Sequence, residues 1–424
     1  MSFKFKVGQK VPGSLARAGV ISTPHGNIHT PAFIVVGTKA TVKALAPEQV
    51  KDLGAQAVLA NTYHLYLQPG DETVRDAGGI HRFMNWSGPI FTDSGGFQAF
   101  SLGAGFNREI SKIGTKIIAK PETSEDVGDV MATVTEDGVK FKSYIDGSEH
   151  FFTPERSMEI QYNLGADIIF AFDECTSPNA SDAYQKEALR RTHAWAKRSL
   201  EHHQKLKSEA RNQKSEANSN PKELQAISDF DIRHSNLQQQ ALFGVVQGGR
   251  RELLRKESAT VLAAMDFDGY GIGGSFDKED MGTAVRWVNE ILPEDKPRHL
   301  LGIGEPIDII LGIENGIDTF DCVIPTRMGR NGTIMVEGGR INIMNSEFRN
   351  DFQPIEEGCG CYTCTNYTRA YLAHLFRAKE MLAATLASIH NTHFLVSFVE
   401  RIRRSVLHGT FPELKEELVR IYNK

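Results

Sequence analysis

Three of the five cysteines in this chain lie within one short stretch, GCGCYTC, and their types and spacing suit a metal site. Cys359, Cys361 and Cys364 follow the pattern C-x-C-x2-C, which does not easily let them pair with one another, whereas a tight turn can direct three thiolates at one point. Zinc takes four ligands in a tetrahedron, so a fourth ligand must come from elsewhere. Because Cys175 and Cys322 lie far back in the sequence, downstream histidines are the better candidates.

The fourth ligand is expected among His374, His390 and His393. The segment 367–388 has a helical pattern without Gly or Pro, so the last two of these histidines should fall just past the end of a helix. These patterns leave the choice of histidine open, and chance clustering of buried thiols is the alternative for the whole group. A zinc ion with four protein ligands holds a fold together and does not activate water. The chemistry must therefore lie elsewhere in the chain.

Carboxylates in two other stretches suit glycosidic chemistry. Asp93, in FTDSGGFQ, directly follows an apolar run and precedes two glycines, which let the backbone approach a ligand closely. Asp321 ends the apolar run in DTFDCVIPTR, but its neighbour Asp318 could equally be the functional residue. In a pair of such groups, one carboxylate attacks an anomeric carbon and the other manages the proton of the leaving group. The alternatives are a helix N-cap or turn role for Asp93 and ordinary salt bridging for such a pair.

Polar groups that end three other apolar runs could read the edge of a purine. Asp173 and Gln247 end the fourth and fifth runs, and Gly273 and Gly274 end the sixth. A carboxylate, an amide and a bare backbone that converge on one slot can match the donors and acceptors of a purine base. Taken singly, each group has a plainer explanation, namely a satisfied polar residue or a tight turn.

The net charge of −5 argues against a global attraction to nucleic acid but does not exclude local basic patches. Arg327 and Arg330, in PTRMGRNG, follow Asp321 closely and could bind phosphate groups or base edges beside the reaction centre.

Eight short apolar runs, each ending in a polar or glycine-rich cluster, set the expected fold. The runs are PAFIVVGTK, AQAVLANTYH, PIFTDSGGFQ, ADIIFAFDECT, ALFGVVQGG, GYGIGGS, HLLGIGEP and TFDCVIPTR. Helical patterns lie between most of them, and apolar strands separated by helices indicate a parallel sheet that is buried on both faces. Eight such units predict a (β/α)8 barrel, although a doubly wound sheet would give similar local patterns.

In a barrel, the active site gathers at the carboxyl ends of the strands. The polar side chains expected there are Asn61, His64, Asp93, Asp173, Glu174, Gln247, Glu305 and Asp321.

The expected organisation is one barrel with insertions. The barrel and an N-terminal extension cover residues 1–340, with surface insertions near 104–135 and 205–240; the second has few apolar residues and is expected to be mobile. The stretch VTEDGVKFKSYIDGSEHFF has the pattern of a hairpin at the barrel mouth. Residues 341–393 form the zinc-binding subdomain, inserted after the last strand, and residues 394–424 form the closing barrel helix and a C-terminal helix.

Composition favours a cytoplasmic protein. The cysteines are few and odd in number, and the chain starts with a polar segment, MSFKFKVGQK, which together favour a reducing compartment. No run approaches the roughly 18 to 20 consecutive apolar residues that span a bilayer, so a membrane role is not expected.

The ordered set FTDSGGFQ, AFDECT, VVQGG, GIGG, FDCVIPTRMGRNG and C-x-C-x2-C, with a histidine 26 residues after the last cysteine, closely resembles the tRNA-guanine transglycosylase family over almost the whole length. The resemblance implies a (β/α)8 barrel with a zinc subdomain inserted after the last strand. It also implies a queuine tRNA-ribosyltransferase activity, in which guanine at the wobble position 34 of tRNA with a GUN anticodon is exchanged for a 7-deazaguanine on the route to queuosine. The tRNAs would be those for Asp, Asn, His and Tyr.

The resemblance assigns roles to single residues. Asp321 matches the nucleophile, which selects it over Asp318, and Asp93 matches the general acid and base. The positions expected to bind the base are Asp93, Ser94, Gly95, Gly96, Phe97, Asp173, Gln247, Gly273, Gly274 and Leu301. The positions expected to contact tRNA are Gly302, Ile303, Gly304, Glu305, Pro306, Ile307, Asp308, Thr326, Arg327, Met328, Gly329 and Arg330. The ligands of one structural Zn²⁺ per subunit become Cys359, Cys361, Cys364 and His390.

Further expectations concern the incoming base and the assembly. Cys175, in DECT, matches the bacterial form of the family, which implies 7-aminomethyl-7-deazaguanine as the incoming base. The loop after the sixth strand reads GGSFDKED and departs from the bacterial pattern at Ser275. The family also implies a cytoplasmic homodimer. The alternatives are a deazaguanine transglycosylase that acts on DNA and an inert tRNA-binding subunit of a paired enzyme, against which Asp93, Asp321 and the complete zinc set argue.

Overall fold

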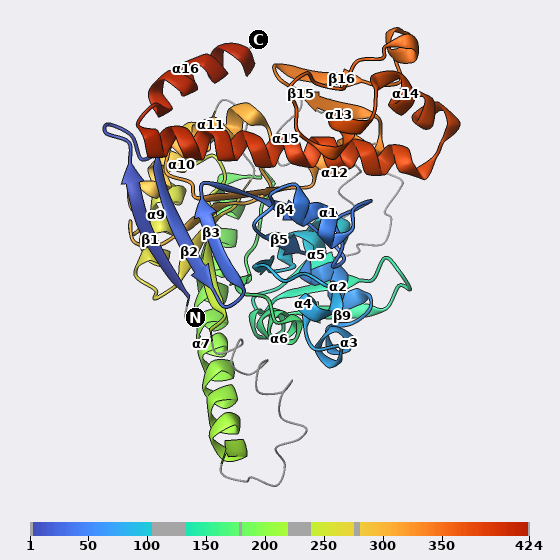
Figure 1. Cartoon of the computed structure of the whole chain (residues 1–424). Helices are drawn as coiled ribbons and strands as arrows, with labels where there is room; N and C mark the ends of the chain where they lie inside the picture. The colour runs from blue at the N-terminus through green and yellow to red at the C-terminus, as the bar shows by residue number, and fades with distance from the viewer. Residues whose placement is uncertain (1–2, 104–131, 178–179, 219–238, 275–279, 423–424) are drawn as a thin grey trace, which may run out of the picture. The chain divides into compact units, whose positions relative to one another are not determined.

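The structure is a computed structural model of the 424-residue chain and describes residues 3–103, 132–177, 180–218, 239–274 and 280–422 (Figure 1). By its internal contacts the chain divides into two compact units. The first unit comprises residues 1–5, 21–26 and 60–299, and the second comprises residues 6–20, 27–59 and 300–424.

Eight strands form a closed barrel in the order β10-β11-β12-β13-β14-β4-β5-β6. They are β4 (Ala32–Val36), β5 (Val58–Ala60), β6 (Ile90–Thr92), β10 (Ile168–Phe170), β11 (Ala241–Val246), β12 (Gly269–Ile272), β13 (Arg298–Leu300) and β14 (Thr319–Cys322). Seven of the strands lie within one of the apolar runs of the sequence, and β13 begins one residue before its run, at Arg298; all residues of the eight strands are buried. The prediction of a (β/α)8 barrel is therefore confirmed.

The first unit carries helices between its barrel strands. They are α2 (Thr62–Leu67), α3 (Asp71–Asp76), α4 (Ile80–Phe83), α5 (Gly96–Gly103), α6 (Pro154–Leu164), α7 (Asp182–Asn218), α9 (Glu252–Ala263) and α10 (Met281–Asn289). The expected hairpin is present within an antiparallel sheet of β7 (Ala132–Val134), β8 (Val139–Lys142) and β9 (Glu149–Phe152).

The two expected insertions are described only in part. Residues 205–218, which we expected to be mobile, continue the helix α7, drawn in green in Figure 1. Most of the first insertion, residues 104–131, and most of the second, residues 219–238, lie outside the described residues.

Three N-terminal strands form a separate sheet that the sequence patterns did not predict. They are β1 (Lys4–Lys10), β2 (Arg17–Thr23) and β3 (Gly26–Thr30), in the order β1-β2-β3. Most of β1 is exposed, which is why its polar residues read as an unstructured extension.

The second unit holds the remaining elements. They are α1 (Pro47–Asp52), α11 (Pro306–Glu314), α12 (Ile324–Arg330), β15 (Thr333–Val336), β16 (Gly339–Asn342), a 3-10 helix (Ser346–Asn350), α13 (Tyr362–Asn366), α14 (Arg369–Ala378), α15 (Met381–His408) and α16 (Phe411–Tyr422). The long helix α15, drawn in red, packs against α12, α13, α14 and β15 (Figure 1).

The helix expected over residues 367–388 is in fact two helices. Lys379 adopts the left-handed conformation, with φ of 59°, and ends α14, after which Glu380 begins α15. We had expected His390 and His393 past the end of a helix, but both lie inside α15. The same helix runs across the boundary that we expected between residues 393 and 394.

Helix α15 is long and apolar enough to pass a composition test for a membrane span, with a mean hydropathy of 1.2 over its most apolar window. That window is 61% buried inside the structure, which is typical of the core helix of a globular protein.

Candidate functional site

Asp93 directly follows β6, and two neighbouring residues hold its carboxylate. The backbone N–H of Thr62 donates to its Oδ1 at 2.8 Å, and Asn61 donates to Oδ2 through its side-chain amide. Asn61 is the N-cap residue of α2 and Thr62 its first residue, whose backbone N–H has no partner within the helix. The Asp93 carboxylate is therefore oriented by fixed donors. The Oδ1 atom of Asn61 is buried and has no hydrogen-bond partner among the described residues.

Asp173 and Gln247, which follow β10 and β11, form one buried network. The Ser94 hydroxyl donates to Asp173 Oδ1 at 2.9 Å, and Gln247 Nε2 donates to Asp173 Oδ2 at 2.7 Å. Gln247 is 3% exposed, and its Oε1 has no partner within the described part of the chain. A buried acceptor without a partner costs about 1 to 3 kcal/mol, which a ligand N–H group would recover. The structure thus brings these three predicted residues together.

The two glycines after β12 let their backbone lie directly against this network. A Cβ on Gly273 would lie 2.7 Å from Gln247 Nε2, and one on Gly274 would lie 2.4 Å from Arg255 Nη2. Gly274 also has φ of 101°, which favours glycine. The next residue of the predicted pattern, Ser275, lies outside the described residues.

Arg255, in α9, supports the same backbone and was missed by the sequence analysis. Its Nε donates to the Gly249 carbonyl at 2.7 Å and its Nη1 donates to the Gly273 carbonyl at 2.8 Å. The guanidinium is fully buried, and this burial lowers the pKa of Arg255 to about 9. The available signal was the helical spacing of Arg255 from Ser258, Ala259 and Leu262, which lie on the buried face of α9.

Both glycines of the D-S-G-G stretch occupy positions where a side chain would not fit. Gly95 has φ of 78°, and a Cβ on Gly96 would lie 2.7 Å from the Asp173 carbonyl. Phe97, in the first turn of α5, and Leu301, directly after β13, are both partly exposed.

In the second unit, Asp318 and Asp321 have different surroundings. Arg17 donates from Nε and Nη2 to the two carboxylate oxygens of Asp318, at 3.0 and 2.7 Å, and both side chains are almost fully buried. Asp321 lies in β14 opposite Ile34 of β4, and its Oδ1 accepts from the Gly302 N–H at 2.7 Å. Asp318 is thus committed to a buried ion pair, which leaves Asp321 as the candidate for chemistry.

Only part of each loop expected to contact tRNA is accessible. The partly or fully exposed residues are Gly302, Glu305, Ile307, Arg327, Met328 and Arg330. The buried residues are Ile303, Gly304, Pro306, Asp308, Thr326 and Gly329. The exposed residues are the ones available for contact with RNA in this structure.

Cations gather beside α12. Burial lowers the pKa of Lys43, and the charges of Arg330, Arg327 and Lys39 lower it further, so these four side chains lie near one another. Both lysines come from the loop after β4, the strand that pairs with β14. The two lysines were not among the predicted site residues, although a closed barrel pairs its first strand with its last.

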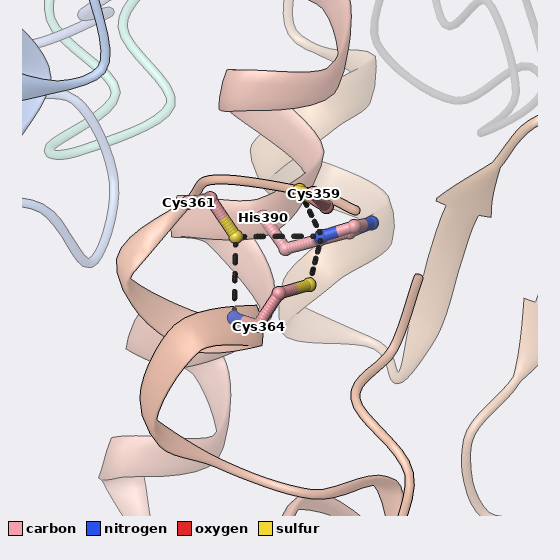
Figure 2. Close-up of side chains that lie close together, drawn as sticks. All are labelled: Cys359, Cys361, Cys364 and His390. Carbon is pink, nitrogen blue, oxygen red and sulfur yellow. Dashed lines mark hydrogen bonds between the residues drawn. The ribbon is translucent and has the colours of Figure 1, made fainter. Parts of the chain in front are cut away.

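The cysteine cluster has the geometry of a four-ligand metal site (Figure 2). His390 Nδ1 lies 3.8, 3.6 and 3.2 Å from the Sγ atoms of Cys359, Cys361 and Cys364. In a zinc tetrahedron, bonds of about 2.3 Å to sulfur and about 2.0 Å to nitrogen separate these corners by about 3.5 Å. The cluster can therefore hold a metal ion of this size, and the fourth residue is His390, not His374 or His393.

The other ring nitrogen of His390 fixes its orientation. Nε2 donates to the Met335 carbonyl in β15 at 2.8 Å, which leaves the Nδ1 lone pair for the cluster. The Cys361 Sγ atom accepts from the backbone N–H of Cys364 at 3.4 Å, since it caps the short helix α13. Hydrogen bonds from the Cys361 and Cys364 thiols lower the pKa of Cys359, and the hydrogen bonds of Cys364 with Cys359 and Cys361 raise the pKa of Cys364.

A second group of possible metal ligands, His25, His81 and Asp167, has a different geometry. The two imidazoles are stacked, with ring centroids 3.6 Å apart and planes 19° apart. A metal ion bound to both rings would have to lie near both planes, and planes this close to parallel do not meet near the nitrogens. Each ring instead bonds its own oxygen of Asp167, at 2.7 and 3.0 Å. The group is a hydrogen-bonded clasp at the start of β10.

Comparisons with known proteins agree along the whole chain. The model of the family described as queuine tRNA-ribosyltransferase matches residues 13–424. A queuine tRNA-ribosyltransferase from Caldanaerobacter subterraneus subsp. tengcongensis is 43% identical over 99% of this chain and 98% of its own. Those from Desulforamulus reducens and Symbiobacterium thermophilum are 42% and 44% identical, over 100% and 98% of this chain and 100% and 90% of their own.

Proposed function

Because this chain belongs to the queuine tRNA-ribosyltransferase family, and is thus a pentosyltransferase that acts on tRNA and guanine bases, we propose its substrates and mechanism in finer detail. The enzyme exchanges guanine at the wobble position 34 of tRNAs with GUN anticodons for 7-aminomethyl-7-deazaguanine. Two carboxylates, Asp321 and Asp93, carry the reaction. The observation that supports this most is that each carboxylate lies at the carboxyl end of a barrel strand and is oriented by a backbone N–H, from Gly302 and Thr62 respectively.

The reaction is a double displacement. A carboxylate oxygen of Asp321 forms a bond to C1′ of the ribose as the bond between C1′ and the guanine nitrogen breaks, through an oxocarbenium-like transition state. Asp93 protonates the departing guanine, whose nitrogen keeps the electron pair. The incoming base then loses a proton to Asp93 and attacks C1′, which releases Asp321. One glycosidic bond replaces another of the same kind, so the exchange needs no nucleotide cofactor.

The buried network of the first unit recognises the base. Guanine and 7-deazaguanine present adjacent N–H donors, and the Asp173 carboxylate and the Gln247 Oε1 atom are acceptors. The buried Oε1 of Gln247, without a partner among the described residues, supports this role because a bound base satisfies it. Ser94, Gly95, Gly96 and the backbone at 273 and 274 shape the slot.

Zinc is the metal that we propose for the cysteine cluster, one ion per subunit. The ligands are Cys359, Cys361, Cys364 and His390, whose separations fit a zinc tetrahedron. When bound, zinc would hold α13 to α15, and with four protein ligands it would leave no position for a substrate. Three thiolates and one imidazole are also the donor set that zinc favours over magnesium or calcium.

We further propose a cytoplasmic homodimer that binds tRNA through the exposed residues of the two loops. Arg327 and Arg330, together with Lys39 and Lys43, supply local positive charge for the RNA backbone despite the net charge of −5. Sedimentation of the protein with and without tRNA tests the assembly.

Incubation of the protein with unmodified tRNA of the Asp, Asn, His or Tyr type and labelled guanine tests the function. Label should enter the tRNA, unlabelled 7-aminomethyl-7-deazaguanine should displace it, and Asp321→Asn should abolish incorporation. Incorporation into duplex DNA but not into tRNA would point instead to a transglycosylase that acts on DNA. Tight tRNA binding without incorporation would point to an inert subunit.

A further inference from the structure

We propose that Arg340 is a positioning residue that braces the nucleophile through Glu305. Its guanidinium, in the β15–β16 hairpin, bonds both carboxylate oxygens of Glu305, in the loop between β13 and α11. The same loop contains Gly302, whose N–H orients Asp321. The inference rests on the role proposed above for Asp321.

The loop between β13 and α11 is short and lies against the nucleophile's strand. It runs from Leu301 to Glu305. Gly302 has φ of 75°, a conformation that favours glycine, and its N–H lies 2.7 Å from Asp321 Oδ1. A Cβ on Gly304 would lie 2.6 Å from the Cβ of Cys322, so the loop backbone touches β14 directly. A shift of this loop therefore shifts the donor that orients Asp321.

Glu305 ends the loop and begins α11, but its side chain does not cap that helix. A carboxylate at this position ordinarily gains by accepting the free N–H groups of the first turn. Here it reaches to Arg340 of the hairpin instead, so the loop is tied to a second element at the residue where the helix starts.

The hairpin that carries Arg340 is itself anchored on α15. Arg340 lies opposite Met335 in the register of β15 and β16. The Met335 carbonyl accepts from His390 Nε2 at 2.8 Å, and the Met335 N–H donates to Asn391 Oδ1 at 2.9 Å. Arg340 therefore pairs with Met335, the residue that is hydrogen-bonded to His390 of the cysteine cluster. The brace connects this anchored hairpin to the loop beside Asp321.

The ion pair is too exposed to matter for global stability. The Arg340 and Glu305 side chains are 37% and 20% exposed, and surface pairs of this kind contribute little. Catalysis is far more sensitive to position, since a displacement of about 1 Å can lower a rate on the order of 100-fold. Removal of the brace should therefore lower kcat and leave the melting temperature nearly unchanged.

The test compares Arg340→Gln, Glu305→Gln and the double variant with the wild type, which must first exchange guanine in tRNA. If the wild type does not exchange guanine in tRNA, the proposed function is wrong. The role of Arg340 is measured by comparison with a wild type that does exchange guanine. Arg401→Gln is the matched control, because Arg401 pairs with Glu337 in the turn of the same hairpin and, among the described residues, makes no hydrogen bond or ion pair with the loop. Arg340→Lys, which keeps the charge, should recover part of the activity.

We expect each single variant to lower kcat about tenfold, with the same loss in the rate of covalent adduct formation and no further loss in the double variant. KM for tRNA should stay within about twofold in Arg340→Gln, each chain should keep one zinc ion, and Arg401→Gln should behave as the wild type. Wild-type kcat in Arg340→Gln would overturn the inference. The inference would also be overturned if Arg340→Gln raised only KM for tRNA and did so equally in a chain that already carries Glu305→Gln. Arg340 would then bind RNA directly.

Discussion

The clasp of His25, His81 and Asp167 makes a quantitative prediction about stability. Burial opposes ionisation of Asp167, but hydrogen bonds from His25 and His81 outweigh it and lower the pKa of Asp167 from 3.8 to about 2. This difference corresponds to about 2 kcal/mol of folding free energy at neutral pH. Because the folded pKa is the lower one, the contribution is complete above about pH 4 and is lost as the pH falls towards 2.

Asp167→Asn should therefore destabilise the protein at pH 7 by about 2 kcal/mol. For 424 residues, an unfolding entropy of about 2.1 cal/mol/K per residue converts this loss into a fall in melting temperature of about 2 to 3 °C. Scanning calorimetry from pH 7 down to pH 3 measures it, with Asp52→Asn, at an exposed position, as the control.

The difference in stability between wild type and Asp167→Asn should narrow as the pH falls from about 4 towards 2, because Asp167 takes up a proton first in the unfolded chain and only then in the folded protein. Burial lowers the pKa of His81, although the hydrogen bond that His81 donates to Asp167 acts in the opposite direction, so the wild type should also lose stability as the pH falls below about 6.5. The reasoning would be refuted if wild type and Asp167→Asn had the same melting temperature at pH 7, or if the difference between their melting temperatures did not change with pH. An increase in melting temperature with added zinc that depends on Asp167 would show that the group is a metal site after all.

Three other predictions concern the second unit and the base slot. His390→Ala should lose zinc, measured as metal content per chain, and should lower the melting temperature because α13 and β15 lose their link to α15. Gln247→Leu should raise KM for the free base about 10-fold to 100-fold, measured by guanine exchange, because a buried acceptor is removed; an unchanged KM would contradict its role. Arg17→Met should destabilise the protein by about 3 to 5 kcal/mol in calorimetry by leaving Asp318 buried without its partner, and Asp318→Leu in the same chain should recover much of this loss.

The barrel could be predicted from the sequence because its strands are buried on both faces. Each strand then appears as a continuous apolar run that ends in a polar cluster, which local patterns reveal. The N-terminal sheet lacks this signal. Most residues of β1 are exposed and polar, so its pairing with β2 depends on contacts that no local pattern contains.

The helix boundary at Lys379 shows another limit. A left-handed residue that ends a helix is usually glycine, and a lysine in that conformation gives no warning in the sequence. Because no boundary was predicted there, His390 was expected past the end of a helix. The family resemblance had grouped it with the three cysteines, and the structure places it beside them.

The candidate site was predictable where a residue type implied a role by itself. Carboxylates and glycines after apolar runs marked Asp93, Asp173 and Gly274. Arg255 and Arg340 were not found, because each acts through a backbone group or a partner that is distant in the chain. Supporting residues of this kind become visible only when the fold brings the elements together.

The central claim is that Asp321 bonds covalently to the ribose of tRNA, and trapping that adduct tests it most directly. The protein is incubated with unmodified tRNA, separated by denaturing electrophoresis, and the modified peptide is identified by mass spectrometry. We predict a covalent band in the wild type, with the ribosyl group on the peptide that contains Asp321, and no band for Asp321→Asn. An adduct on another residue, or one that persists in Asp321→Asn, would contradict the account.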